Sequence, residues 1–275
     1  MNSHFKGKLI CKDKVLEFNG RNAKIMGILN VTPDSFSDGG VNCDKENAIR
    51  HAVEMAEYGA DIIDIGGEST RPGYVPVSVE EELERVCSVV ELVHRETDVL
   101  ISVDTSKPNV ADAALRCGAH IINDVTGFAS EDMCTVQKKY NSGAIAMFNN
   151  RTYSDDKRAI EDRAADFFMT VSSKIKSGLI IDPGIGFGTD SEEDLKLVRN
   201  IERFKNMNSV PLLLALSRKR MIASYMGRPS DAAERDSATV GANLAGIGLG
   251  ADIIRVHDVK GAADSLRLWE TIMDF

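Results

Sequence analysis

One alternation runs along the whole chain: a short apolar run of strand length, a polar or glycine-rich loop, and an amphipathic stretch of helix length. Continuous apolar runs, rather than strictly alternating ones, are typical of a parallel sheet that is covered on both faces. The eight runs are Lys24–Val31, Asp61–Ile65, Val99–Val103, His120–Ile122, Ala144–Phe148, Leu179–Ile181, Pro211–Leu216 and Asp252–Val256. This repetition predicts an α/β fold built from eight strand–helix units.

The stretches between the runs carry helix signals. The expected helices include Asn47–Tyr58, Val79–Arg95, one that starts near Pro108, and Ser191–Phe204, and we place Trp269 in the core. A chain of 275 residues has an ordinary length for one closed (β/α)₈ barrel. We therefore predict one TIM-barrel domain over residues 1–275.

Residues 1–20 precede this pattern and suggest a short β-hairpin. Leu9–Cys11 and Val15–Phe18 flank a turn at Lys12-Asp13-Lys14, and we place the hairpin across the bottom of the barrel. The other fold considered is an open doubly wound sheet, whose phosphate loop should follow the first strand as GxGxxG. Asn30-Val-Thr-Pro33 stands there instead, which favours the barrel.

Composition narrows the class of function. A formal net charge of −9 repels phosphate backbones, so we expect no nucleic-acid partner. No apolar run reaches membrane-spanning length, and Met1–Ile10 lacks the apolar stretch of a signal peptide. The scattered cysteines, without a CxxC pair, indicate reduced thiols, a cytoplasmic protein and no zinc site: Cys11, Cys43, Cys87, Cys117 and Cys134.

Cationic residues gather at the ends of the last two runs. Lys219 follows the seventh run, and Arg255 and His257 share one face of the eighth. All carboxyl ends of barrel strands meet at one face, where the last strands often bind phosphate. A buried arginine is costly unless it is paired or holds an anion. These residues therefore indicate a site for a small anionic substrate.

A complementary set of acceptors ends three other runs. Asp104, Asn123 and Asp182 offer two carboxylates and an amide, which suit a flat heterocycle rich in amino and ring N–H groups. Purely structural carboxylates would look the same, and helix capping accounts equally well for Asp124 and Ser217. The loops at residues 32–41 and 69–76 have the small, turn-prone composition of lids.

Seven motifs, in order and over nearly the whole chain, resemble those of the dihydropteroate synthase family. The two longest are Asn30-Val-Thr-Pro-Asp-Ser-Phe-Ser-Asp-Gly-Gly40 and Gly66-Gly-Glu-Ser-Thr-Arg-Pro-Gly73. The others are Ser102-Val-Asp-Thr-Ser-Lys107, Ile122-Asn-Asp-Val125, Asp182-Pro-Gly-Ile-Gly-Phe-Gly188, Ser217-Arg-Lys219 and Arg255-Val-His257. The resemblance implies a dimeric barrel that joins 4-aminobenzoate to 6-hydroxymethyl-7,8-dihydropterin diphosphate and releases diphosphate. It also implies a sulfonamide target in folate synthesis.

The resemblance assigns roles to individual residues. Asp104, Asn123, Asp182 and Lys219 would hold the pterin. Asn30, Thr70, Arg255 and His257 would bind diphosphate, with Mg²⁺ near Asn30. Arg71, Pro72 and Lys219 would frame the aminobenzoate. Of these, Asp104, Lys219 and Arg255 would be the catalytic residues.

Three positions depart from the family's usual pattern: Met147-Phe148 stands where Met-His is usual, Thr189 stands where many members have Lys, and Arg220 where many have Ser. A non-catalytic pterin-binding paralogue is therefore the second hypothesis. It should have lost some of the key residues, and none is lost. A methyltetrahydrofolate-binding methyltransferase barrel ranks third, because it does not need the Thr-Pro-Asp-Ser-Phe or Ser-Arg-Lys motifs.

Overall fold

Eight parallel strands form the centre of the molecule. The computed structural model describes residues 4–31, 41–68, 76–153 and 155–273. The barrel strands are β3 Lys24–Asn30, β4 Ile62–Gly66, β5 Leu100–Asp104, β6 Ile121–Asp124, β7 Gly143–Met147, β8 Leu179–Asp182, β9 Leu213–Leu214 and β10 Ile253–Val256. Their order is β8-β7-β6-β5-β4-β3-β10-β9, and a bridge between Ile181 and Leu212 joins the two edges. The predicted barrel is confirmed.

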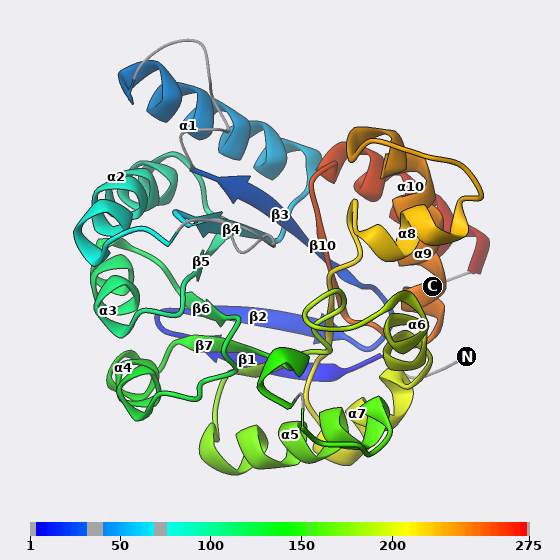
Figure 1. Ribbon diagram of the computed structural model, residues 1–275. Coiled ribbons are helices and arrows are strands. Elements are labelled where there is room, and N and C mark those ends of the chain that lie inside the picture. Colours follow the sequence, from blue (N-terminus) through cyan, green and yellow to red (C-terminus); the bar gives the residue numbers. More distant parts are fainter. Residues whose placement is uncertain (1–3, 32–40, 69–75, 154, 274–275) are drawn as a thin grey trace.

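Helices surround the strands and alternate with them along the chain (Figure 1). They are α1 Val41–Tyr58, α2 Val79–Glu96, α3 Pro108–Cys117, α4 Glu131–Tyr140, α5 Ile160–Lys174, α6 Ser191–Arg199, α7 Ile201–Asn208, α8 Arg220–Tyr225, α9 Asp236–Gly248 and α10 Val259–Met273, with 3₁₀ turns η2 Asn150–Tyr153 and η3 Ala233–Arg235. Pro108 begins α3, as expected. Trp269 packs against the core from α10 while staying partly exposed.

The predicted continuous helix Ser191–Phe204 is wrong, because the chain breaks it at Asn200. This residue ends α6 and begins α7, with φ −98° and ψ 9°. Its side-chain Nδ2 donates a 2.9 Å hydrogen bond to the carbonyl of Lys196. Asparagine side chains compete in this way with the helical hydrogen-bond ladder, so the apolar period continues across a bend.

The predicted N-terminal hairpin is confirmed and seals one end of the barrel. It consists of β1 Lys6–Cys11 and β2 Lys14–Asn19, paired antiparallel. Its inward side chains form one cluster with the first inward residue of the barrel strands: Leu9, Cys11, Leu16, Phe18, Met26, Ile62, Leu100, Ile121, Ile145, Ile180, Leu213 and Ile253. Apolar packing therefore closes the amino ends of the strands.

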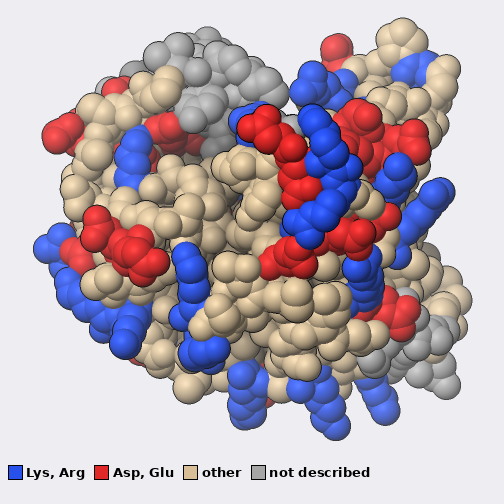
Figure 2. Space-filling model, turned by 60° about the horizontal axis from the view of Figure 1, so that its bottom comes forward, with Lys and Arg blue, Asp and Glu red and all other residues tan. Residues whose placement is uncertain are grey.

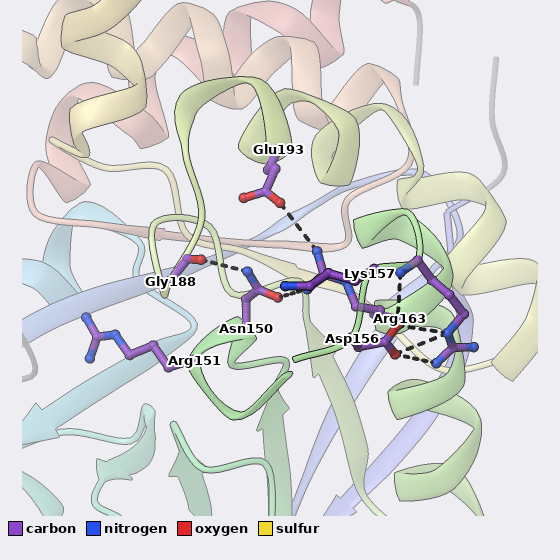
Figure 3. A pocket seen from close by; sticks show the side chains of 8 residues that line it. Asn150, Arg151, Asp156, Lys157, Arg163, Gly188 and Glu193 are labelled. Atoms are coloured by element: carbon purple, nitrogen blue, oxygen red, sulfur yellow. Dashed lines mark hydrogen bonds and ion pairs between the residues drawn. The ribbon is translucent and has the colours of Figure 1, made fainter. Parts of the chain in front are cut away.

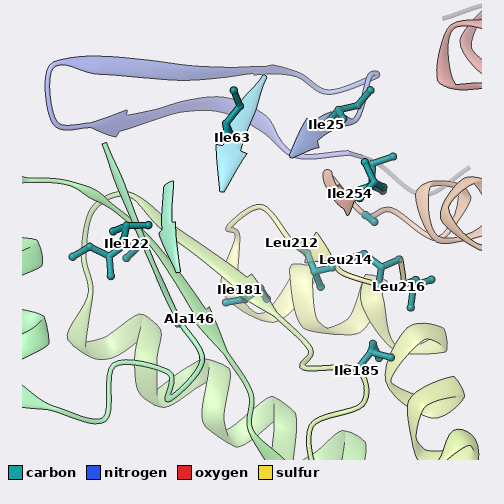
Figure 4. Packing of buried hydrophobic residues seen from close by; sticks show 14 of the residues in the cluster. Ile25, Ile63, Ile122, Ala146, Ile181, Ile185, Leu212, Leu214, Leu216 and Ile254 are labelled. Carbon is teal, nitrogen blue, oxygen red and sulfur yellow. The ribbon is translucent and has the colours of Figure 1, made fainter. Parts of the chain in front are cut away.

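The alternate strand residues face outward and pack under the helices. Figure 4 shows part of this layer, including Ile25, Ile63, Ile122, Ile181 and Ile254. A period of two thus separates the helix-facing residues from the inward ones. Over one outer face, basic and acidic side chains are interspersed (Figure 2). Among the described helices, none is long and apolar enough to span a membrane.

Candidate active site

The inward residues change from apolar to polar towards the carboxyl ends of the strands. Two residues beyond Ile62, Ile121, Ile180 and Ile253, on the same strand faces, stand Asp64, Asn123, Asp182 and Arg255. Asp104 lies four residues after Leu100 on β5, and therefore on the same face of the strand. It pairs in register with both Gly66 and Asn123. Parallel strands in register therefore bring these polar side chains together inside one end of the barrel.

Arg255 joins two carboxylates across the barrel. Its Nε donates to Asp64 Oδ2 at 2.7 Å and its Nη2 donates to Asp104 Oδ2 at 3.0 Å. Asn123 Nδ2 donates to the same Asp64 oxygen at 3.0 Å. The structure thus brings three of the predicted residues together through a fourth, Asp64, which the sequence analysis did not single out. The sequence did contain a signal for Asp64: it is an acidic residue inside an apolar run, and another run of the same barrel carries the arginine that can pair with it.

Asp104 carries an acceptor that the protein does not use. Its Oδ1 is buried and has no hydrogen-bond partner among the residues that the structure describes. Burial and the nearby negative charge of Asp64 raise the pKa of this carboxyl to about 7, against the opposing effect of Arg255. Buried polar atoms are rarely left unpaired in native proteins. This oxygen is therefore a natural contact for a ligand N–H group.

Asp182 and Lys219 form the opposite wall. Asp182 Oδ1 accepts a 2.8 Å hydrogen bond from the Gly184 N–H, and burial raises the pKa of Asp182. Gly184 has φ +68°, and a Cβ there would lie 1.7 Å from the Phe148 carbonyl oxygen. Only glycine permits that close approach, which fixes the loop after β8.

Lys219, the residue that precedes α8, reaches the same loop. Its Nζ donates to the Ile185 carbonyl at 2.5 Å and lies 5.2 Å from the centre of the Phe187 ring. Burial lowers the pKa of Lys219 to about 8, although the neighbouring Asp182 opposes the shift. The ammonium group of Lys219 thus lies over the face of an aromatic ring, a cation–π arrangement.

His257 is held by Ser217. The Ser217 hydroxyl lies 2.8 Å from His257 Nδ1 and accepts a 3.2 Å hydrogen bond from the His257 backbone N–H. Ser217 therefore orients a site residue rather than capping a helix. Asp124 has a structural role in the loop that follows it, because it accepts hydrogen bonds from the backbone N–H groups of Thr126 and Phe128.

The remaining predicted residues fall at or beyond the edge of the described chain. Asn30 is the last residue of β3 and pairs in register with Gly66, beside Asp104. Thr70, Arg71 and Pro72 lie outside the described residues, as do most residues of the two predicted lids. Glu68, the residue immediately before the second of these segments, is bound by Lys107, which also donates to Glu82 Oε2 at 2.6 Å.

A separate cavity of about 700 Å³ lies among the segments that follow β7 and β8 (Figure 3). Its buried Arg163 donates to Asn150 Oδ1 at 2.7 Å and pairs with Glu193 at 3.3 Å. Arg158 is likewise paired with Asp156. None of the predicted site residues lines this cavity. Its charged groups mainly form ion pairs and hydrogen bonds with one another.

Comparison with known proteins identifies the family of the chain. The model of the family described as "Pterin binding enzyme" matches residues 26–257. Dihydropteroate synthase of Clostridium beijerinckii is 42% identical over 265 residues, which cover 94% of this chain and 97% of the relative. The chain belongs to the dihydropteroate synthase family.

Solved structures of dihydropteroate synthases have the same fold. The enzyme from Xanthomonas albilineans with 4-aminobenzoic acid has a TM-score of 0.89 at 36% identity. The match covers 98% of this chain and 99% of the chain of that enzyme. The same enzyme in complex with 7,8-dihydropteroate has a TM-score of 0.87 at 34% identity, covering 98% and 100%.

The three departures from the usual dihydropteroate synthase pattern lie in structural positions. Phe148 is fully buried on the helix side of β7, with its ring 5.3 Å from Tyr153 and 5.8 Å from Phe167. Thr189 Oγ1 donates to Asp194 at 2.6 Å within the loop after β8. Arg220 is the exposed first residue of α8. Phe148 therefore packs behind the site and does not line it.

Proposed function

We propose that the protein condenses 6-hydroxymethyl-7,8-dihydropterin diphosphate with 4-aminobenzoate to give 7,8-dihydropteroate and diphosphate. The observation that carries this proposal is the cluster of the buried Asp64, Asp104 and Asn123 with the partly buried Arg255, in which Asp104 Oδ1 is left as an acceptor. A pterin presents amino and ring N–H donors in one plane, which this array of acceptors matches. The family membership of the chain supports the same substrate.

The pterin would lie between Asp104, Asn123, Asp182 and Lys219. When the bond between the methylene carbon and the diphosphate oxygen breaks, the electron pair leaves with diphosphate. The methylene carbon becomes cationic and conjugated to the pterin ring. Asp104 and Asp182 can stabilise this charge through the ring nitrogens, since electrostatic preorganisation acts strongly in a buried site.

The diphosphate would be held at the mouth by Asn30, Thr70, Arg255 and His257. Mg²⁺ bound to phosphate groups takes only one or two protein oxygens and keeps several waters, so the single amide oxygen of Asn30 fits such an ion. Bound there, Mg²⁺ would neutralise charge that develops on the leaving group. Arg255 Nη1, which is not used in the bonds to Asp64 and Asp104, is the guanidinium donor suited to the diphosphate.

The aminobenzoate would be framed by Arg71, Pro72 and Lys219. Its neutral aniline nitrogen attacks the methylene cation, forms the new C–N bond and then loses a proton to solvent. Because the cation is strongly electrophilic, the reaction needs positioning rather than a strong general base. The solved relative with 4-aminobenzoic acid supports this second substrate. We also propose a cytoplasmic homodimer, on the strength of the family resemblance.

The test is product formation by the purified protein. With Mg²⁺ and both substrates, we expect 7,8-dihydropteroate, identified by mass spectrometry, and an equal amount of diphosphate. The second hypothesis, a non-catalytic pterin-binding paralogue, predicts pterin binding by calorimetry without turnover. The retention of Asn30, Asp104, Asp182, Lys219 and Arg255 favours the enzyme.

A further inference from the structure

Asp64 is a carboxylate in the middle of a core strand. It lies between Ile63 and Ile65 on β4 and is fully buried. One oxygen, Oδ2, accepts hydrogen bonds from both Arg255 and Asn123. The other, Oδ1, is buried with no hydrogen-bond partner in the described part of the chain. A buried charge is retained at a cost in stability, so its contacts indicate what it does.

The first contact determines which way the Asn123 amide faces. An ionised carboxylate can only accept hydrogen bonds, so Asn123 must present its Nδ2 to Asp64. The amide oxygen of Asn123 is then the atom left for a ligand. Without Asp64 the amide could turn over and present its N–H groups to the pterin donors. The carboxylate thus converts an ambiguous side chain into a fixed acceptor.

The second contact determines the plane of the Arg255 guanidinium. Asp64 on β4 binds Nε and Asp104 on β5 binds Nη2, so two carboxylates hold two nitrogens of one rigid, planar group. A single acceptor would leave the guanidinium free to rotate about the contact. With both in place, Nη1 has a fixed direction.

We propose that Asp64 is a positioning residue for the pterin half of the reaction, acting by orienting Asn123 and Arg255 together. This inference rests on the proposed function. Both hydrogen bonds that Asp64 Oδ2 accepts come from Asn123 and Arg255, so Asp64 acts through these two side chains. Loss of Asp64 should therefore impair the pterin substrate selectively and leave recognition of 4-aminobenzoate intact.

The test compares Asp64→Asn with Asp61→Asn, a matched control at the residue immediately before the same strand. Asp61 binds Lys24 Nζ at 2.8 Å and the Ile25 N–H at 2.9 Å, away from the polar cluster. Hydrogen bonds to charged groups are worth about 1.5–3 kcal/mol, or roughly ten- to a hundredfold. We expect Asp64→Asn to weaken 7,8-dihydropteroate binding by that factor in calorimetry and to lower kcat, with the KM for 4-aminobenzoate within about twofold of wild type. Asp61→Asn should match wild type.

A double-mutant cycle identifies the route. In an Arg255→Lys background the same Asp64→Asn change should cost much less, because its partner is already lost. Should Asp64→Asn fail to fold, Asp64→Glu keeps the negative charge beside Arg255 but moves the acceptor oxygen, and the pterin-selective loss should persist. Equal losses for both substrates, full additivity with Arg255→Lys, or wild-type pterin binding in Asp64→Glu would overturn the proposal. The calorimetry needs no turnover, so it separates this result from failure of the proposed function.

Discussion

The two ends of the barrel are built from the same strands, but the side chains inside them differ: one end is apolar and the other is polar. At the amino ends, the inward residues Ile62, Leu100, Ile121, Ile180 and Ile253 are apolar and are covered by the hairpin. Two to four residues further along, the same strand faces carry charged residues and one amide that are joined by hydrogen bonds. The comparison teaches that one end is built for stability and the other for binding, although both are buried.

The largest expected effect follows removal of a charge from the polar end. Asp104→Ala and Arg255→Ala should each lower turnover by about two orders of magnitude or more, as does loss of one preorganised electrostatic partner. Steady-state kinetics with both substrates measures this. Near-normal rates in either variant, with its fold verified by circular dichroism, would remove that residue from the catalytic role.

The apolar end should show the reverse behaviour. Leu16 lies in the hairpin, 3% exposed, against the bottom layer of the barrel. Leu16→Ala should lower the free energy of unfolding by about 2–5 kcal/mol, because truncating a core leucine leaves a cavity. Denaturant unfolding checks this, with kcat and both KM values expected to stay near wild type. A loss of turnover without a loss of stability would contradict the division between the ends.

An effect of pH on activity should come from the polar end. Burial lowers the pKa of Lys219 from 10.5 to about 8, so the unfolded chain binds more protons than the folded one between these values. The contribution of Lys219 to stability therefore rises with pH across that interval. Activity should fall there as the cation is lost, giving an alkaline limb in kcat/KM near pH 8. In Lys219→Arg the residual activity should lack this limb; persistence of the limb would assign it to another group.

The smallest effect is expected at Phe148. Its ring packs against Tyr153 and Phe167, away from the barrel interior. Phe148→His restores the usual family residue and should leave kcat and KM within about twofold, while lowering stability by about 1–3 kcal/mol. Steady-state kinetics and thermal unfolding test this together. A clear gain in turnover would place position 148 in the site after all.

Much of the fold was predictable, because the order of apolar and polar residues along the chain indicates where strands lie and which of them are buried. The apolar runs located the strands, although only Leu213–Leu214 of the expected Pro211–Leu216 forms a regular strand. The break at Asn200 was missed because it depends on one side chain bonding its own helix. Asp64 was missed for a similar reason: its importance arises from Arg255, 191 positions away in the chain. Such a pairing exists only once the barrel closes.

The site residues beyond the described chain stay predictions. Thr70, Arg71 and Pro72 are assigned by resemblance, as are the dimer and the magnesium ion. Asp104, Asn123 and Arg255 were predicted separately, and the structure joins them: Arg255 binds both Asp104 and Asp64, and Asn123 binds Asp64. Register explains why: residues at the ends of parallel neighbouring strands must lie side by side. The roles of Asp104, Asn123 and Arg255 toward the substrates stay predictions as well.

The most direct test of the division between the two ends is a crystal structure of the protein with 7,8-dihydropteroate. The account predicts the pterin ring inside the carboxyl end of the barrel, with its N–H groups on Asp104 Oδ1 and the Asn123 amide oxygen. A pterin bound elsewhere, such as in the cavity beside Arg163, with no ligand at Asp104, would contradict it.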